Sequence, residues 1–269
     1  MPGLQIVLGL GDNSEVPIPI NLLKRLISSV ASCCLALAAQ AAEVSVAVAA
    51  NFTAPMKVIA QNFEKDTGHK ARLAFGATGQ FYAQIKNGAP FAILLAADEA
   101  TPAKLEKEGL GLAGTRFTYA TGKLVLWSKK ANLVDNRGDI LRTGGFNKIA
   151  IASPKLAPYG AAAMEVIEKM GLTAAITPKI VQGANIGQAF QFVSSENATL
   201  GFVALSQVFE GGRIKDGSGW IVPLNMYKPI KQDAIMLNSG MDNPAAQALM
   251  QYLRSEKAKV VIHSFGYQL

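Results

Sequence analysis

Cysteine and histidine, the residues that most often bind zinc or act as nucleophiles and bases, are scarce in this sequence. The two cysteines are Cys33 and Cys34, and the two histidines are His69 and His263. His69 falls in a polar stretch between a predicted helix and a predicted strand, and His263 falls in a predicted terminal helix. The sequence has no G-x-S-x-G, H-E-x-x-H or Walker motif. It therefore predicts no enzymatic activity and no cofactor.

The sequence also lacks a long apolar run, and this affects how the N-terminal segment is interpreted. Leu22–Arg25 is a basic segment, residues 26–38 are mainly apolar, and residues 39–41 read Ala-Gln-Ala. This order is typical of a cleavable signal peptide, and the apolar part is too short to span a bilayer. We predict a signal peptide over residues 1–41 and a periplasmic protein. Lipidation at Cys33, which follows Val30-Ala-Ser, is the alternative.

Cleavage after Ala41 would remove both cysteines. The remaining chain would need no disulfide, because it is long enough to bury a core without one. Because no cysteine would remain after cleavage, a structural Cys–zinc site and a catalytic cysteine are excluded.

The net charge of the chain is moderate and positive. The formal net charge is +7, and removal of residues 1–41 leaves it unchanged, because Lys24 and Arg25 balance Asp12 and Glu15. A basic surface favours anionic partners, although scattered charge also simply keeps a protein soluble. No cluster of lysine and arginine is interleaved with aromatic residues, so nucleic acid is not an expected partner.

Apolar strand-like segments alternate with amphipathic helical segments through the rest of the chain. This alternation predicts an α/β fold with mostly parallel sheets. An extended apolar stretch over Tyr119–Ser128 and a second over Ile230–Leu237 are expected to cross between two lobes. The predicted lobes are residues 42–122 and 123–232, with residues 233–269 returning to the first. Ligand sites in such folds lie beyond the carboxyl ends of the strands, here in the cleft between the lobes.

Four loops after predicted strands resemble one another, since each precedes a predicted helix by one to three residues. They contain Ala50 and Asn51, Thr78 and Gly79, Tyr159 and Gly160, and Asn185, Ile186 and Gly187. Helix starts present free N–H groups and the positive end of the helix dipole, which suits an anion. Ordinary helix capping by Asn and Thr is the alternative for any single loop.

None of these loops has a charged residue at the proposed contact positions. A protonated oxyanion needs a hydrogen-bond acceptor, and a carboxylate is the usual one. Neutral donors alone suit a fully deprotonated tetrahedral dianion, because each hydrogen bond to a charged group contributes roughly 1.5–3 kcal/mol.

Several motifs, in order along residues 43–269, resemble the periplasmic molybdate-binding proteins of ABC transporters, the ModA family. They are Val48-Ala-Ala-Asn-Phe-Thr-Ala-Pro-Met56, Phe75-Gly-Ala-Thr-Gly79, Gln84-Ile-Lys-Asn-Gly-Ala-Pro90, Leu95-Ala-Ala-Asp98, Pro158-Tyr-Gly160, Gly183-Ala-Asn-Ile186, Leu200-Gly-Phe-Val203 and Phe265-Gly-Tyr267. The resemblance implies a two-lobed type II periplasmic-binding fold that holds molybdate or tungstate through backbone amides and neutral side chains. It implies a membrane ABC permease as partner, and we expect a monomer.

Carried onto this chain, the resemblance implies ligand contacts from Ala50, Asn51, Thr78, Tyr159 and Ile186, with molybdenum bound only as its oxyanion. Thr78 stands where the family usually has serine, and it keeps the hydroxyl. Ala204 stands where some members have a tyrosine, and Tyr159 is expected to supply the phenol instead.

Alternatives to this reading stay open at this point. They are the same fold binding another anion such as sulfate or an organic acid, an exported enzyme on a related fold, and the ligand-sensing domain of a regulator, although no DNA-binding motif is attached. The sequence does not separate molybdate from tungstate.

Overall fold

A computed structural model of the chain describes residues 41–269 and contains two five-stranded sheets. The first sheet has the order β2 (Lys70–Gly76), β1 (Glu43–Ala49), β3 (Ile93–Leu95), β12 (Ile230–Met236) and β4 (Phe117–Gly122). The second has the order β11 (Ser218–Ile221), β5 (Leu124–Ser128), β8 (Leu200–Ala204), β6 (Ile149–Ala152) and β7 (Ile180–Gly183). A hairpin pairs β9 (Phe209–Glu210) with β10 (Arg213–Ile214).

The predicted signal peptide and the alternative lipidation site at Cys33 lie before residue 41, outside the described residues. Within residues 41–269, no helix combines the length and the hydrophobicity that crossing a bilayer requires.

The predicted two-lobed α/β fold is confirmed, but both sheets are mixed rather than mostly parallel. Strand β1 runs parallel to β2 and β3, and β6 runs parallel to β7 and β8. Strand β12 is antiparallel to β3 and β4, and β5 is antiparallel to β8 and β11. Strand β12 is antiparallel to β4 because it returns from the second sheet, against the direction in which β4 leaves the first.

The stretch over residues 119–128 forms two strands instead of one long strand. Strand β4 ends at Gly122 in the first sheet and β5 begins at Leu124 in the second, so Lys123 joins the two lobes. The return strand β12 begins at Ile230, which pairs with Gly122. Residues 230–232, predicted in the second lobe, are thus paired in the first sheet.

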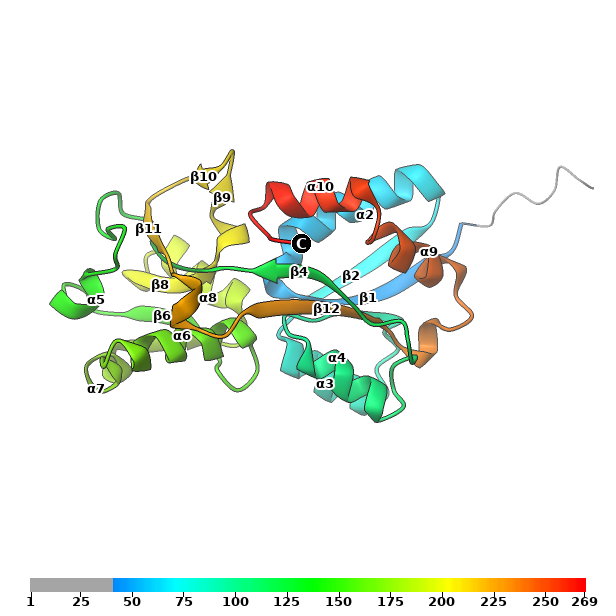
Figure 1. Cartoon of the computed structure of the whole chain (residues 1–269), viewed down its shortest axis with the longest axis horizontal. Coiled ribbons are helices and arrows are strands. Elements are labelled where there is room, and N and C mark those ends of the chain that lie inside the picture. Colours follow the sequence, from blue (N-terminus) through cyan, green and yellow to red (C-terminus); the bar gives the residue numbers. More distant parts are fainter. Residues whose placement is uncertain (1–40) are drawn as a thin grey trace, which may run out of the picture. The chain divides into compact units, whose positions relative to one another are not determined.

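Helices cover both faces of the first sheet. Helices α2 (Thr53–Thr67) and α10 (Glu256–Ser264) lie on one side together with α9 (Pro244–Tyr252), and α3 (Thr78–Lys86) and α4 (Ala100–Lys107) lie on the other (Figure 1). The sequence explains this burial, because Met56, Ile59 and Phe63 recur at helical spacing and form one buried stripe of α2. The separate clusters on the two faces include Phe52 and Leu249, and Phe81 and Leu105, respectively.

The second sheet packs against α6 (Pro158–Lys169) and α8 (Ile186–Ser194), and α5 (Ile140–Thr143) and α7 (Thr173–Ile176) are short additions. Five 3-10 turns complete the described elements: η1 (Ala50–Phe52), η2 (Thr177–Lys179), η3 (Leu205–Gln207), η4 (Leu224–Met226) and η5 (Asn238–Gly240). The stretch over residues 211–219 contains β10 and the start of β11.

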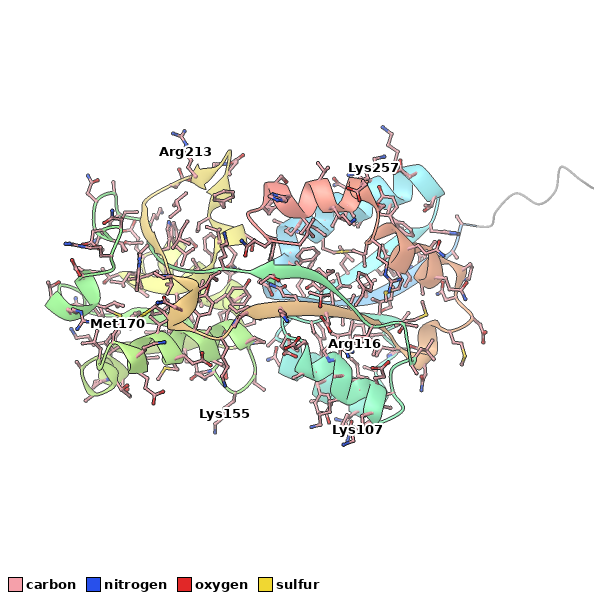
Figure 2. All side chains as sticks on the ribbon, viewed as in Figure 1. Lys107, Arg116, Lys155, Met170, Arg213 and Lys257 are labelled. Atoms are coloured by element: carbon pink, nitrogen blue, oxygen red, sulfur yellow. The ribbon has the colours of Figure 1, made fainter. Side chains whose placement is uncertain are left out.

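Surface cations come from separate elements of the described chain. Figure 2 shows Lys107, Lys155, Arg213 and Lys257 extending from different parts of the molecule, whereas Arg116 lies beside the crossing strands. The scattered cations give no shared basic stripe along these elements.

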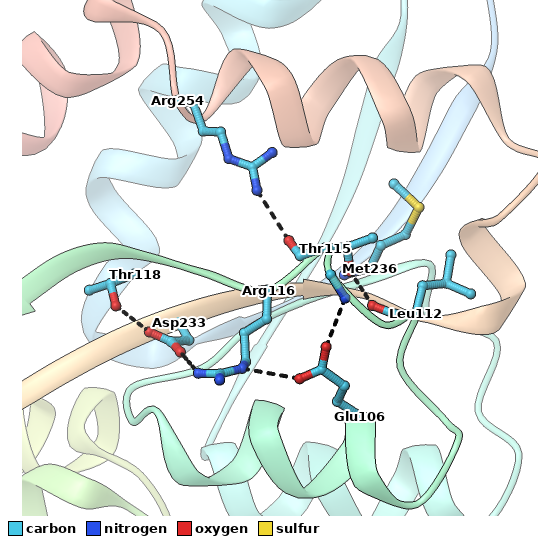
Figure 3. Close-up of polar contacts among 9 residues, drawn as sticks. Glu106, Leu112, Thr115, Arg116, Thr118, Asp233, Met236 and Arg254 are labelled. Carbon is cyan, nitrogen blue, oxygen red and sulfur yellow. Dashed lines mark hydrogen bonds and ion pairs between the residues drawn. The ribbon is translucent and has the colours of Figure 1, made fainter.

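An ion pair between a buried carboxylate and a partly exposed arginine joins the two crossing strands. Asp233 on β12 is 1% exposed; it accepts hydrogen bonds from Arg116 Nη1 at 2.6 Å and from Thr118 Oγ1 at 2.7 Å (Figure 3). Arg116 also donates to Glu106 of α4 at 3.4 Å. This network connects β4, the strand that leaves the first lobe, to β12, the strand that returns to it.

We expect Arg116→Met to destabilise the protein by roughly 3 kcal/mol, because it leaves the Asp233 carboxylate buried without its cation. Chemical denaturation measures the free energy of unfolding. The matched control is Arg137→Met, which breaks the surface pair of Arg137 with Asp139 and should change stability by less than about 1 kcal/mol. Equal effects of the two substitutions would contradict this assignment.

Candidate functional site

The first lobe contributes two helix starts at one edge of its sheet. Strands β1 and β2 are parallel, and Ala49 at the end of β1 is in register with Gly76 at the end of β2. The turn η1 begins at Ala50 directly after β1 and leads into α2, and α3 begins at Thr78 shortly after β2. Parallel strands end at the same edge, so Ala50, Asn51 and Thr78 come together there.

The second lobe repeats this arrangement. Ala152 at the end of β6 is in register with Gly183 at the end of β7. Helix α6 begins at Pro158 and α8 begins at Ile186, so Tyr159 and Ile186 lie in first helical turns. The sequence analysis placed Tyr159 and Ile186 in loops that precede the helices, so it put both helix starts too late. Proline fits the first helical position, and Asn185 caps α8 by accepting from Gln188 N at 3.0 Å.

The five predicted contact residues, Ala50, Asn51, Thr78, Tyr159 and Ile186, line one small cavity. The centre of a water molecule can occupy about 10 Å³ of it. The other lining residues are Ala49, Gly76, Ala77, Ala97, Ala157, Pro158 and Asn185. No charged side chain of the described chain lines this cavity. First-turn N–H groups lack partners within their own helix, and four helix starts from both lobes therefore surround the cavity with donors.

Two hydroxyl groups at the cavity each accept a hydrogen bond from the protein. Thr78 Oγ1 accepts from Ala97 N at 2.9 Å, and the Tyr159 hydroxyl accepts from Gln232 Nε2 at 3.1 Å. Each hydroxyl carries one hydrogen, which is left for donation. Burial raises the pKa of Tyr159 well above its usual range, so its phenol stays neutral and keeps that hydrogen.

The side-chain amide of Asn51 is hydrogen-bonded within the protein. Asn51 is 2% exposed, and its Nδ2 donates to Gln232 Oε1 at 2.7 Å and to the Tyr267 hydroxyl at 2.9 Å. Its Oδ1 is buried and has no hydrogen-bond partner within residues 41–269. With the side chain in this arrangement, the backbone N–H is the donor that Asn51 offers at the cavity.

Sequence reasoning missed the residues behind the cavity. Gln232 is fully buried on β12, and Tyr267 near the C-terminus is 2% exposed. The Tyr267 hydroxyl lies 2.9 Å from Asn51 O and 3.0 Å from Ser206 Oγ. One signal was present in the sequence: Gln232 and Asp233 are polar residues in the middle of a strand, directly before its apolar end Ala234–Met236. Their partners were not visible, because they come from distant segments.

Direct hydrogen bonds join the lobes around the cavity. Ser206 Oγ, which follows β8, donates to Asn51 O at 2.8 Å, and Gly79 N donates to Leu156 O at 2.9 Å. Ala204 lies buried at the end of β8, and its N–H donates to Gln207 Oε1 at 2.9 Å. Ala204 is not among the residues that line the cavity.

A larger, solvent-open groove of about 1380 Å³ also borders Asn51. It is lined by aromatic side chains, including Trp127 and Phe190, whose rings stack at 5.4 Å. Its size and aromatic lining do not match a small anion, so the small cavity is the candidate site.

Catalytic and metal-binding groups do not gather at the cavity. His69 Nδ1 accepts from Ala42 N at 3.1 Å, and His263 is exposed on α10. Over residues 41–269, His, Cys, Asp and Glu form no group of three that could hold a metal ion.

Comparison with known proteins identifies the family to which this chain belongs. A family model described as bacterial extracellular solute-binding protein matches residues 44–268. The molybdate-binding protein ModA of Azotobacter vinelandii is 60% identical over 247 residues, which cover 92% of this chain and 98% of the relative. That of Rhodobacter capsulatus is 49% identical over 233 residues, which cover 87% and 91%. The solved structure of an Azotobacter vinelandii periplasmic molybdate-binding protein matches with a TM-score of 0.81 and 42% identity, covering 84% of this chain and 99% of that one. The chain belongs to the ModA family of solute-binding proteins. The family resemblance predicted from the sequence motifs is therefore confirmed.

The four helix starts lie where a ligand site is expected in a protein of the ModA family. In this fold the ligand lies where the carboxyl ends of strands from two lobes face each other. The cavity lined by Ala50, Asn51, Thr78, Tyr159 and Ile186 occupies that position. Their role as ligand contacts stays a prediction.

The close approach of α6 to the second sheet depends on Gly160. A Cβ atom at this position would lie 2.3 Å from Ala152 O, which is backbone and cannot move aside. We expect Gly160→Ala to lower the free energy of unfolding by about 1–3 kcal/mol, as overpacking does. Urea denaturation measures the change.

Gly145→Ala is the matched control, because its Cβ would meet only Ile140 Cδ1, at 3.4 Å. It should change stability by no more than about 0.5 kcal/mol. A Gly160→Ala protein as stable as this control would show that α6 can shift without cost.

Proposed function

We propose that this protein is an exported solute-binding protein that captures molybdate, or tungstate, and delivers it to an ABC permease. Four helix starts from two lobes meet at one small cavity without a charged side chain, and this observation carries the proposal. ModA relatives at 60% and 49% identity, named molybdate-binding proteins, support this ligand.

The chemistry of the donors favours a fully deprotonated tetrahedral dianion. Backbone N–H groups of Ala50, Asn51 and Ile186 donate to its oxygens, and the hydroxyls of Thr78 and Tyr159 add two neutral donors. Several such bonds hold a dianion without a counter-charge, since each contributes roughly 1.5–3 kcal/mol. A protonated anion such as hydrogen phosphate finds no carboxylate acceptor among the residues that line the cavity.

Ligand contacts from both lobes explain how ligand binding leads to closure of the lobes. The anion binds most tightly when both sets of helix starts face it, so binding stabilises the closed arrangement. The closed lobes then form the surface that a permease recognises. In this proposal the protein acts as a periplasmic monomer, has no cofactor beyond its cargo and performs no catalysis.

Titration calorimetry with molybdate, tungstate, sulfate and phosphate tests the ligand assignment. We expect heat of binding with molybdate and tungstate and at least about tenfold weaker binding of sulfate, a difference of 1.4 kcal/mol. Oxygens lie further from the central atom in the two larger anions, so a rigid ring of donors discriminates by size. Binding of sulfate without binding of molybdate would refute the assignment.

Thr78→Ala tests the cavity itself. Loss of one hydroxyl donor to a charged ligand should weaken molybdate binding roughly 10- to 100-fold. Thr78→Ser keeps the hydroxyl and should bind within about threefold of the original protein. Thr143→Ala, on the surface helix α5, controls for the substitution. Unchanged affinity of Thr78→Ala would remove Thr78 from the site.

A further inference from the structure

We infer that Gln232 is a positioning residue for the oxyanion site, which holds Asn51 of one lobe and Tyr159 of the other in binding geometry. This inference rests on the proposed function. Gln232 does not line the cavity. It acts through its carboxamide, whose Oε1 accepts from Asn51 Nδ2 at 2.7 Å and whose Nε2 donates to the Tyr159 hydroxyl at 3.1 Å.

The backbone around Gln232 is built to aim this side chain. The pairing of β12 with β4 shifts register between Gln232 and Asp233, which oppose Ala120 and Thr118. Tyr119 is therefore the extra residue of a β-bulge, a feature that redirects side chains. Its hydroxyl donates to Ala96 O at 3.0 Å and lies 3.1 Å from Gln232 Oε1. The carboxamide is thus anchored from the strand beside it.

The carboxamide of Gln232 packs closely against Gly122 of the crossing strand β4. A Cβ atom at Gly122 would lie 2.5 Å from Gln232 Nε2 and 2.0 Å from the Tyr159 hydroxyl. The contact of Gln232 with Tyr159 therefore fits only against a glycine on the crossing strand. Gly122 therefore leaves the space in which the Gln232 carboxamide meets the Tyr159 hydroxyl.

The direction of these hydrogen bonds decides what the ligand meets. Because Gln232 donates to the Tyr159 hydroxyl, the phenol hydrogen is left for an anion. Because Gln232 accepts from Asn51, that amide keeps the orientation in which Oδ1 has no partner within the described residues. A side chain at position 232 that only accepts would take the Tyr159 hydrogen for itself. Gln232 therefore fixes the side-chain amide of Asn51 on one side of the cavity and the hydroxyl hydrogen of Tyr159 on the other.

Gln232→Glu tests this control, because a carboxylate accepts and cannot donate. At pH 8 the introduced carboxylate should compete for the Tyr159 hydrogen and repel the dianion, and molybdate should bind at least about 100-fold more weakly. Protonation at lower pH restores one donor and removes the charge. Affinity should therefore recover by at least about tenfold between pH 8 and pH 6.

The original protein, measured over the same pH range, controls for titration of molybdate itself. Gln251→Glu, on the exposed side of α9, controls for an added carboxylate. Gln232→Met fills the same space without hydrogen bonds; it should bind at least about tenfold more weakly with a pH profile parallel to that of the original protein.

A double-mutant cycle asks whether Gln232 acts through Tyr159. Tyr159→Phe removes the hydroxyl that Gln232 orients, so the losses of Gln232→Met and Tyr159→Phe should not add. The combined variant should bind within about threefold of the weaker single variant. Circular dichroism and thermal melting establish that each variant is folded.

Two results would overturn the inference while the original protein still binds molybdate. One is binding by Gln232→Glu and Gln232→Met within twofold of the original protein. The other is a Gln232→Glu loss that is the same at pH 6 and pH 8 together with additive losses in the cycle, as a purely structural role predicts. An original protein that fails to bind molybdate contradicts the proposed function instead.

Discussion

The hydrogen bonds of one buried carboxamide connect the parts of this protein that meet at the cavity. Gln232 is fully buried on the return strand, where an unpaired amide would cost about 1–3 kcal/mol for each lost partner. Asn51 donates to its oxygen, the Tyr119 hydroxyl lies 3.1 Å from the same oxygen, and its nitrogen donates to Tyr159. Two of these three residues line the cavity. The need to satisfy this amide therefore fixes groups from both lobes at once.

The neutrality of the site follows from how the crossing strand distributes its polar residues. Successive residues of a strand point to opposite faces. Gln232 contacts the residues at the cavity, whereas its neighbour Asp233 pairs with Arg116 and Thr118 instead. The Asp233 carboxylate is thereby neutralised by its own cation. No charged side chain of the described residues lines the cavity.

The same contacts that surround the cavity also join the lobes. Ser206 of the second lobe donates to the backbone oxygen of Asn51, and the Tyr267 hydroxyl lies within hydrogen-bonding distance of both. Tyr267 belongs to the C-terminal segment, whose Gln268 bridges to Thr121 of the crossing strand β4. The hydrogen bonds that join the lobes and the polar groups at the cavity thus form one connected set.

The sequence by itself determined the local features. Strand and helix periods located four neutral loops before helices, and the resemblance to the ModA family selected Ala50, Asn51, Thr78, Tyr159 and Ile186 from them, all of which line one cavity. Only the tertiary structure decided the mixed sheets, the division of residues 119–128 between two sheets and the role of Gln232. The reason is distance along the chain. Asn51 is 181 residues from Gln232 and 216 from Tyr267, and no local propensity encodes which buried polar groups will share a hydrogen bond.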